Sequence, residues 1–197
     1  MIYLSSDLHF GHDRDFLWEP RGFNSIEEND NTILKNFKEI LKDEDDLYLL
    51  GDLMLLDNES GIEKLKQIPG KIHIILGNHD SSDRIKLYEQ LPQVQEIVYA
   101  TKIKYKKCHF FLSHYPTITS NYDDNKSYHQ NLINLHGHTH QKTNFYFNNE
   151  INSQEIKNPY MYHVGVDSHD CKPVLLDDII DEIKAYRCDL NNMHLTK

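Results

Sequence analysis

The sequence contains few of the residues that cross-link small secreted proteins or anchor a chain in a membrane. Only three cysteines occur among 197 residues. Cys108, Cys171 and Cys188 are odd in number and far apart, which indicates neither a disulfide framework nor a thiolate zinc site. No apolar run approaches the roughly 20 residues that cross a bilayer, and the start of the chain lacks the basic segment of a secretory signal. These absences favour reduced thiols, a cytoplasmic location and no membrane partner.

Positive charge is also scarce. The 21 lysines and arginines are outnumbered by 31 aspartates and glutamates, which gives a formal net charge of −10 at pH 7. Duplex nucleic acid and anionic membranes are bound through basic surfaces, so the composition disfavours extended nucleic-acid binding. Lys102, Lys104 and Lys106 alternate with apolar residues. A nucleic-acid patch would explain that strip, but a solvated edge strand is the interpretation that we favour.

The first half of the chain alternates strand-like and helix-like patterns. With 39% hydrophobic residues, the chain suits one globular domain that spans residues 1–197. Apolar runs predict strands at residues 2–4, 47–50 and 72–76. Helices are predicted to begin at Ser25, where Glu28 completes a capping box, and near Asn58 and Ser82. This alternation is typical of parallel β-α-β units whose strands are buried on both faces.

After Pro92 the pattern changes to short strands with few helices between them. We expect a second sheet there with more antiparallel pairing. The strand candidates are residues 94–99, 101–106, 108–113, 132–136 and 161–166. A closing helix follows, with Asp177 as its predicted cap and Ile179, Ile180, Ile183 and Tyr186 on its buried face.

Seven side chains that suit metal ions occur in five short blocks, each at the end of a strand-like run. In an extended segment, Asp7 and His9 would point to the same side and hold a single ion, although such pairs also occur by chance. Asp52 follows Gly51 in a turn where its carboxylate can project and bridge two cations, and an ordinary turn is the alternative. His114 alone would be read as a core histidine. The seven residues are Asp7, His9, Asp52, Asn78, His114, His138 and His140.

Two of these blocks are more specific than the others. Residues 77–80, Gly-Asn-His-Asp, follow five apolar residues and combine an amide oxygen with an imidazole. Asp80 is placed where it could orient His79 or raise its pKa. In residues 137–140, Gly-His-Thr-His, two imidazoles two positions apart would face one way on an extended segment. An ordinary turn or strand end seldom needs either arrangement.

The order of the blocks, D-x-H, G-D, G-N-H-D, S-H and G-H-T-H, resembles the calcineurin-like metallophosphoesterase family. The motifs span residues 7–140 and, with Gly165-Val166-Asp167 and the closing helix, the resemblance covers most of the chain. Residues 7–12 and 164–167 look like a group of small bacterial and phage phosphoesterases. The resemblance implies an α/β fold of two facing mixed β-sheets flanked by helices, a four-layer α/β/β/α sandwich. One departure is Leu53-Met54-Leu55, which lacks an acid often found there, so any substrate preference linked to that acid is not transferred.

The resemblance also implies a role for each block. Two divalent ions about 3.5–4 Å apart would share a bridging hydroxide and neutralise charge during in-line displacement at phosphorus. His79, steered by Asp80, would protonate the leaving alkoxide or contact the phosphoryl group. Manganese is the first choice of metal, and iron, cobalt, nickel or zinc also suit these ligands. The first ion would be held by Asp7, His9, Asp52 and His140, and the second by Asp52, Asn78, His114 and His138, with Asp52 bridging.

The loop of residues 10–24 carries two further candidates for the site. Arg21 could hold a phosphate through its planar fork of donors, and His12 lies close to the first block. A solvated arginine and a histidine behind the ligands are equally compatible with the sequence. Aromatic residues on this loop either pack it down or form an apolar wall for a base or acyl group. They are Phe16, Trp18 and Phe23.

The sequence therefore predicts a metal-dependent phosphoric ester hydrolase that acts on small phosphomonoesters or phosphodiesters, nucleotide-like ones among them. One alternative is a nuclease or a pyrophosphatase for a nucleotide-linked substrate. Another is a non-catalytic interaction scaffold of the same fold, which is expected to have lost ligands, whereas all seven are present here. The oligomeric state is left open.

Overall fold

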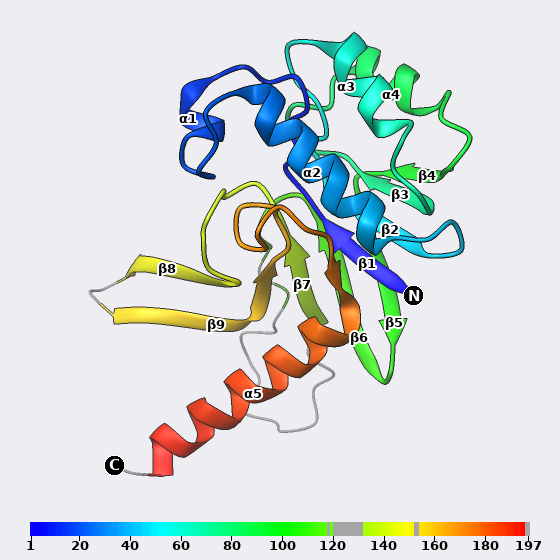
Figure 1. The fold of residues 1–197 in the computed structure, drawn as a ribbon. Coiled ribbons are helices and arrows are strands. Elements are labelled where there is room, and N and C mark those ends of the chain that lie inside the picture. Colours follow the sequence, from blue (N-terminus) through cyan, green and yellow to red (C-terminus); the bar gives the residue numbers. More distant parts are fainter. Residues whose placement is uncertain (118, 120–131, 152–153, 196–197) are drawn as a thin grey trace.

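The computed structural model describes residues 1–117, 119, 132–151 and 154–195. Two five-stranded sheets face each other (Figure 1). The first contains β1 (Ile2–Ser5), β2 (Asp46–Leu49), β3 (Lys71–Ile75), β4 (Val94–Val98) and β10 (Val174–Leu175). Its order is β10-β1-β2-β3-β4, with β1 to β4 parallel and β10 antiparallel to β1. The predicted β-α-β half of the chain is confirmed.

The second sheet is mixed. Its strands are β5 (Ala100–Tyr105), β6 (Cys108–Ser113), β7 (Leu132–His136), β8 (Phe145–Ile151) and β9 (Gln154–His163). In the order β5-β6-β7-β9-β8, the two outer pairs are antiparallel and the two inner pairs are parallel. Lys102 and Lys104 are exposed on the edge strand β5, as the edge-strand interpretation predicts.

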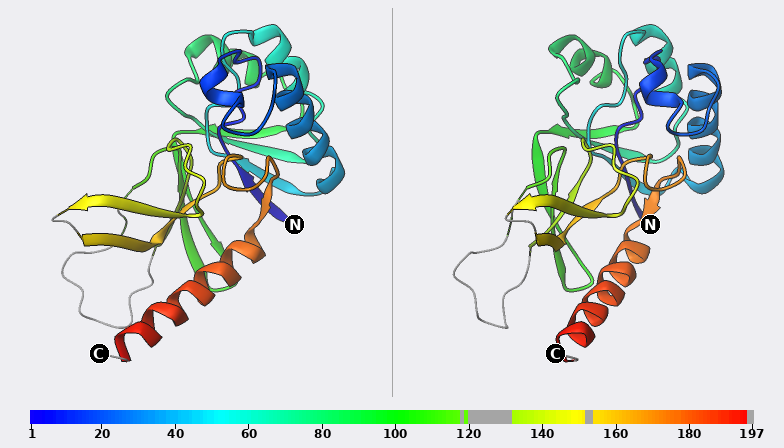
Figure 2. Two further views of the ribbon diagram at one scale, coloured as in Figure 1. Left: turned by 60° about the vertical axis from the view of Figure 1, so that its left-hand side comes forward. Right: turned by 90° about the vertical axis from the view of Figure 1, so that its left-hand side faces the viewer.

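Helices cover the outer face of the first sheet (Figures 1 and 2). They are α2 (Ile26–Ile40), α3 (Asn58–Leu65) and α4 (Ser82–Tyr88), while the short α1 (Asp15–Trp18) lies beside the start of α2 (Figure 1). At the start of α2, the side chain of Ser25 accepts a hydrogen bond from the Glu28 amide, as predicted. Ile33 and Phe37 of α2 are fully buried against this sheet. Burial of each such side chain contributes about 1.5–3 kcal/mol.

A second core lies between the two sheets. Tyr3 packs in the core under the helices, whereas the next residue, Leu4, packs in the core between the sheets. This alternation is expected of a strand with both faces buried. The final helix, α5 (Leu176–Leu195), adds Ile179, Ile180 and Ile183 to the second core. The two facing mixed sheets with flanking helices are confirmed.

Two details of the predicted topology are wrong. Residues 94–98 pair parallel with β3 in the first sheet and do not belong to the second, because α4 returns the chain to the edge of the sheet that it left. Asp177 does not cap the closing helix, since α5 begins at Leu176. Its carboxylate instead accepts from Nζ of Lys106 at 2.7 Å. Strand β8 and the first residues of β9 were not predicted.

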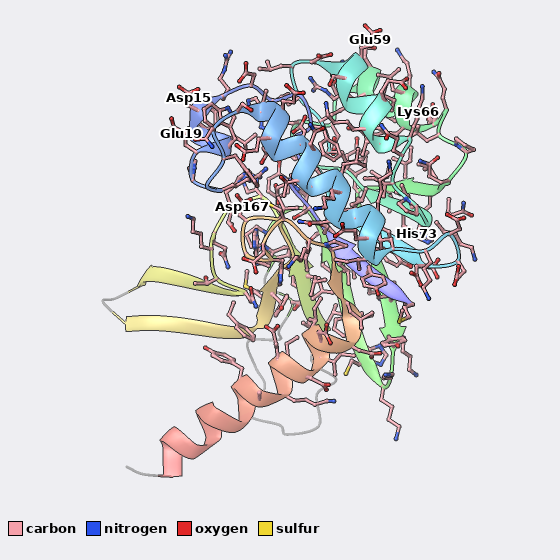
Figure 3. The ribbon with its side chains drawn as sticks, viewed as in Figure 1. Asp15, Glu19, Glu59, Lys66, His73 and Asp167 are labelled. Carbon is pink, nitrogen blue, oxygen red and sulfur yellow. The ribbon has the colours of Figure 1, made fainter. Side chains whose placement is uncertain are left out.

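The carboxyl ends of the inner strands reach one rim of the sandwich. Parallel strands place their carboxyl ends at the same edge, where sites in α/β proteins form. Asp167, which follows β9, lies at this rim between the segment of α1 and α2 and the second sheet (Figure 3). Cys108 and Cys171 are free thiols, as predicted, and the side chain of Cys188 lies outside the described residues. Among the described residues, no helix is both long and apolar enough to cross a membrane.

Candidate metal centre

The five sequence blocks converge at this rim in two groups of potential metal ligands. Within each group, the ligand atoms lie within 4.8 Å of one another. Asp52 belongs to the second group but also borders the first, since its Oδ2 lies 3.4 Å from Nε2 of His114 and 3.6 Å from Nε2 of His9. The first group is Asp7, His9 and His140, and the second is Asp52, His114 and His138.

The backbone of these blocks is not extended, contrary to the geometry assumed from the sequence. Asp7, His9, Asp52, His138 and His140 all have positive φ angles, between 48° and 69°. This left-handed region is sparsely populated by residues other than glycine, and such strain is concentrated at functional sites. Alternation along a strand therefore does not explain the pairing. The two histidines of residues 137–140 do not share one ion site but join different groups.

Hydrogen bonds turn the histidines so that Nε2 faces the carboxylates. Nδ1 of His114 donates to the carbonyl oxygen of Leu50 at 2.7 Å. Nδ1 of His140 faces Oδ2 of Asp167 at 3.0 Å, and its Nε2 lies 3.9 Å from Asp7. A metal-binding histidine typically donates its other ring hydrogen to a carbonyl or carboxylate in this way. Each of these contacts places a ring hydrogen on Nδ1, so in the neutral imidazole Nε2 carries the lone pair that can bind an ion.

Asp7 is buried and held by short contacts. Its Oδ2 accepts from Oγ of Ser6 at 2.6 Å, and the amide of His138 donates to both carboxylate oxygens at 3.0 and 3.1 Å. Burial raises the pKa of Asp7, an effect that the neighbouring His140 and His114 only partly offset. A bound cation would supply the compensation that a buried carboxylate needs.

Asp52 and His114 form the most strongly coupled pair. Burial alone would raise the pKa of Asp52, but its contact with His114 and a hydrogen bond from the His79 amide lower it to about 2. Burial disfavours the charged form of His114, yet Asp52 and Asp7 raise its pKa to about 8. The centre therefore carries two carboxylates in a pocket of imidazoles, an arrangement that attracts cations.

The histidine-to-carboxylate distances in the centre fit metal ions better than hydrogen bonds. Nε2 of His9 is buried and has no hydrogen-bond partner among the described residues. The Nε2-to-carboxylate distances of 3.4, 3.6 and 3.9 Å exceed the usual 2.7–3.2 Å of an N–H···O bond. Two ligand atoms that bind one ion at about 2.1 Å with tetrahedral angles lie about 3.4 Å apart. The residues present therefore fit a pair of divalent ions.

Asn78 brings an amide oxygen to the second group. Its Oδ1 lies 2.9 Å from Nε2 of His114 and 2.9 Å from Nδ1 of His138. The next residue, His79, stands at the edge of the centre with a side chain that is 41% exposed, and its Nε2 lies 4.0 Å from Oδ2 of Asp52. Arg84 donates to the His79 carbonyl oxygen at 2.6 Å and holds this position. The His79 ring can therefore meet a bound molecule from the solvent side.

Asp80 does not have the role predicted for it. Its Oδ2 accepts from the amides of Gly77 at 2.7 Å and Asp52 at 3.0 Å, and its Oδ1 accepts from the Tyr88 hydroxyl at 2.8 Å. These bonds direct both oxygens to the backbone and to Tyr88 rather than to the His79 ring. Asp80 therefore organises the loop that presents Asn78 and Asp52, and the prediction that it steers His79 is corrected.

Arg21 also differs from both of its predicted roles, whereas His12 lies where the predicted alternative of a histidine behind the ligands puts it. The Arg21 side chain is 2% exposed, and its guanidinium donates to Asp167, Asn29 and the Asp7 carbonyl oxygen. With its donors engaged in this way, Arg21 is placed as a structural residue rather than as a phosphate ligand or a solvated loop residue. His12 is buried, with Nδ1 3.4 Å from Nδ1 of His9, so it supports a predicted ligand from behind.

Two residues of the centre were not selected from the sequence. Asp167 belongs to the Gly165-Val166-Asp167 motif, but nothing in its position along the chain indicates the contact with His140. Tyr115 follows His114, and its ring lies edge-on to His138 with the centroids 4.7 Å apart, while the residue remains 50% exposed. The only signal in the sequence is the aromatic residue type next to a strand-end histidine.

The chain is similar over most of its length to several other proteins. An uncharacterized protein of Methanocaldococcus jannaschii is 30% identical over 190 residues, which cover 93% of this chain and 91% of that protein. The gene 66 protein of Mycobacterium phage L5 is 29% identical, covering 84% of this chain and 86% of that protein. The crystal structure of a protein of unknown function from Aquifex aeolicus matches with a TM-score of 0.64 and 25% identity, covering 92% of this chain and 98% of that one.

The family model of the calcineurin-like phosphoesterase superfamily domain matches residues 1–157, which include all seven candidate ligands. A non-catalytic scaffold of this fold is expected to have lost ligands, whereas both ligand groups are intact here. The chain belongs to the calcineurin-like phosphoesterase superfamily and is a phosphoric ester hydrolase.

Proposed function

We propose that this protein hydrolyses small phosphomonoesters or phosphodiesters with two divalent metal ions. The observation that carries the proposal is the position of Asp52, whose Oδ2 lies within 3.6 Å of a histidine from each ligand group. A carboxylate there can serve two ions at once. Asp7, His9 and His140 would complete the first site, and Asn78, His114 and His138 the second, each site sharing Asp52.

Bound ions would supply an activated water and offset the charge that develops on the phosphoryl oxygens. The chain itself would supply orientation and a proton. The backbone of residues 77–80 is fixed by Asp80 and Arg84, so the ring of His79 is held at the rim. From there His79 can donate a proton to the leaving oxygen or a hydrogen bond to the phosphoryl group, as a general acid does.

Manganese is the metal that we propose for the assay. Asp7, Asp52 and Asn78 offer oxygen ligands, while the imidazoles offer nitrogen, a mixture that first-row divalent ions accept. Thiolates, which would favour zinc or copper, are not part of either group. Iron, cobalt, nickel and zinc remain alternatives for the same ligand set.

Nucleotide-like phosphoesters are the substrates that the exposed aromatic residues favour. Tyr115 packs on His138 at one side of the centre. Phe16 is 71% exposed and packs edge-on against His12, with the centroids 5.7 Å apart. Exposed aromatic rings beside a phosphate site can stack on a base, which is worth about 1–3 kcal/mol per base. The net charge of −10 argues against a long polynucleotide.

The decisive experiment is a hydrolysis panel with metal-free protein reconstituted with one ion at a time. Substrates would be aryl phosphomonoesters, aryl phosphodiesters and cyclic mononucleotides, with Mn²⁺, Co²⁺, Ni²⁺, Zn²⁺ and Mg²⁺. Asp52→Asn should lose hydrolysis, whereas Asp43→Asn, in an exposed turn, should retain it. Full activity of Asp52→Asn would overturn the bridging role, and no hydrolysis by metal-loaded protein would overturn the proposed reaction.

A further inference from the structure

Arg21 bonds to two residues near it in the sequence and to one that is far along the chain. Its Nε and Nη2 contact Oδ1 and Oδ2 of Asp167 at 2.8 and 3.1 Å, a bidentate pair between residues 146 positions apart. Nη2 also donates to the Asp7 carbonyl oxygen at 2.8 Å, and Nη1 donates to Oδ1 of Asn29 at 3.2 Å. Bidentate guanidinium pairs fix orientation as well as charge. Arg21 thus ties the loop of residues 10–24 to the first ligand group.

The carboxylate of Asp167 also contacts His140, a candidate metal ligand. The same Oδ2 that accepts from Arg21 lies 3.0 Å from Nδ1 of His140. A carboxylate accepts only, so the ring hydrogen of His140 must reside on Nδ1. Nε2, turned toward Asp7, is then left with a free lone pair. Arg21 fixes the carboxylate, and the carboxylate fixes the imidazole.

In the second ligand group, Nδ1 of His114 is held by a backbone group and not by a carboxylate. Its Nδ1 donates to the carbonyl oxygen of Leu50, a backbone group at the end of β2. The orientation of His114 is therefore set by the sheet, whereas that of His140 depends on two side chains. Changes at Arg21 or Asp167 should affect the first site and leave the second largely unchanged.

We propose that Arg21 and Asp167 are positioning residues that hold His140 in its metal-binding tautomer and thereby set the affinity of the first metal site separately from the second. This inference depends on one part of the proposed function, namely that the two ligand groups bind metal ions. The hydrogen-bond geometry itself can be tested without any metal.

The sharpest variant is Asp167→Asn. Guanidinium groups only donate. Nε of Arg21 donates only to Oδ1 of Asp167, whereas Nη2 also donates to the Asp7 carbonyl oxygen. The amide oxygen of the new side chain should therefore stay with Nε, and its NH₂ should take the place of Oδ2, facing His140. Nδ1 of His140 must then accept, and the ring hydrogen moves to Nε2, the atom needed for the metal. The matched control is Asp170→Asn, on the same loop, where the side chain is exposed and φ is 50°, a conformation that asparagine tolerates.

The tautomer is measured by nitrogen-15 NMR of the histidine side chains in metal-free protein. We expect hydrogen on Nδ1 of His140 in the parent and in Asp170→Asn, and on Nε2 in Asp167→Asn. Titration with Mn²⁺, followed by calorimetry and by electron paramagnetic resonance of coupled ion pairs, should show a 10–100-fold weaker first site in Asp167→Asn. The affinity of the second site should stay within about twofold.

Three outcomes would overturn the inference. They are an unchanged tautomer in Asp167→Asn, an unchanged first-site affinity, and an equal loss at both sites, which would indicate general structural damage. If Asp167→Asn does not fold, Arg21→Lys decides, because lysine keeps the charge but not the planar fork. Unchanged metal binding by Arg21→Lys would then reject the proposal. A parent protein with the expected tautomer that binds no metal would reject the proposed function instead.

Discussion

The carboxylate of Asp80 accepts a hydrogen bond from the backbone amide of Asp52 at 3.0 Å. The two residues follow neighbouring parallel strands, β2 and β3, and lie 28 positions apart. Asp80 also accepts from the amide of Gly77 and from Tyr88, so one buried carboxylate connects both strand-end turns. The spacing between Asp52 and Asn78, from different turns, depends on this connection.

His79→Ala should reduce turnover without removing metal. The ring lies 4.0 Å from Asp52 at the exposed rim and is in neither ligand group. We expect kcat to fall by about 10²–10⁴-fold, the usual contribution of a general acid or base, while the bound Mn²⁺ per chain stays the same. Steady-state kinetics and metal analysis of the same preparation check this. Loss of metal together with activity would make His79 structural.

Tyr88→Phe should weaken the support of the residue 77–80 turn. The Tyr88 side chain is fully buried and its hydroxyl donates to Asp80 at 2.8 Å. Removing the hydroxyl leaves a buried carboxylate oxygen without that donor, which costs about 1–3 kcal/mol. Urea denaturation should show this loss in Tyr88→Phe. Tyr99→Phe is the control, because Tyr99 is 79% exposed, and equal stability of the two variants would contradict the assigned support role.

Gly51→Ala should damage the centre far more than Gly22→Ala. Both glycines have positive φ, 86° and 90°, so alanine is strained at either position. At Gly51 the added Cβ would lie 2.6 Å from Gly77 and from Nδ1 of His114, whereas at Gly22 it would meet open space among the described residues. We expect Gly22→Ala to lose about 1–3 kcal/mol of stability and keep its activity.

Gly51→Ala should in addition lose Mn²⁺ binding, because the backbone must shift where Asp52 and His114 approach each other. Calorimetric titration of the two variants measures the difference. Equal metal affinity in both would show that the close packing at Gly51 does not set the geometry of the centre.

Removal of metal should abolish hydrolysis and lower the melting temperature without unfolding the protein at room temperature. The two hydrophobic cores do not include the ligands, so the fold should persist. A ligand at about 100 times its Kd stabilises the folded state by about 2.7 kcal/mol. Thermal melts with and without chelator, followed by Mn²⁺ addition, test both points. An unchanged melting temperature after complete metal removal would contradict the ligand assignment.

Tyr115→Ala should affect substrates selectively. If the exposed ring stacks on a base, kcat/KM for a cyclic mononucleotide should fall about 5–150-fold, which corresponds to the roughly 1–3 kcal/mol of one stacking contact. Hydrolysis of a small alkyl phosphoester should change little. Tyr115→Phe keeps the ring and should behave like the parent toward both. A uniform decrease for all substrates would indicate that Tyr115 supports His138 rather than a base.

Much of the first sheet was predictable from the sequence because its signals are local. Apolar runs followed by turns gave β1, β2 and β3, and a Ser25 cap with an apolar stripe gave α2. The sheet to which β4 belongs was not predictable in this way. Its short apolar run fits either sheet, and only the return path through α4 places it beside β3.

The ligand blocks were recognised from residue type and order, but their geometry was not. Positive φ at Asp7 and His9 replaced the extended conformation that the D-x-H spacing suggested. Backbone strain of this kind is imposed by surrounding contacts, such as the hydrogen bond from the Asp7 amide to the Gly51 carbonyl oxygen. A local pattern does not contain those contacts.

By itself, the sequence determined which types of metal ligand are present. They are carboxylate and amide oxygens and imidazole nitrogens at the ends of predicted strands, in an acidic chain of one family. Only the tertiary structure decided which of these residues contact one another. Because parallel strands bring distant turns to one rim, Asp52 lies between the two groups, Asp80 binds backbone amides instead of His79, and Arg21 turns inward to Asp167 instead of outward to a phosphate. Those pairings depend on which polar groups are buried and therefore need a hydrogen-bond partner. How the chain packs decides this, and a local sequence pattern does not.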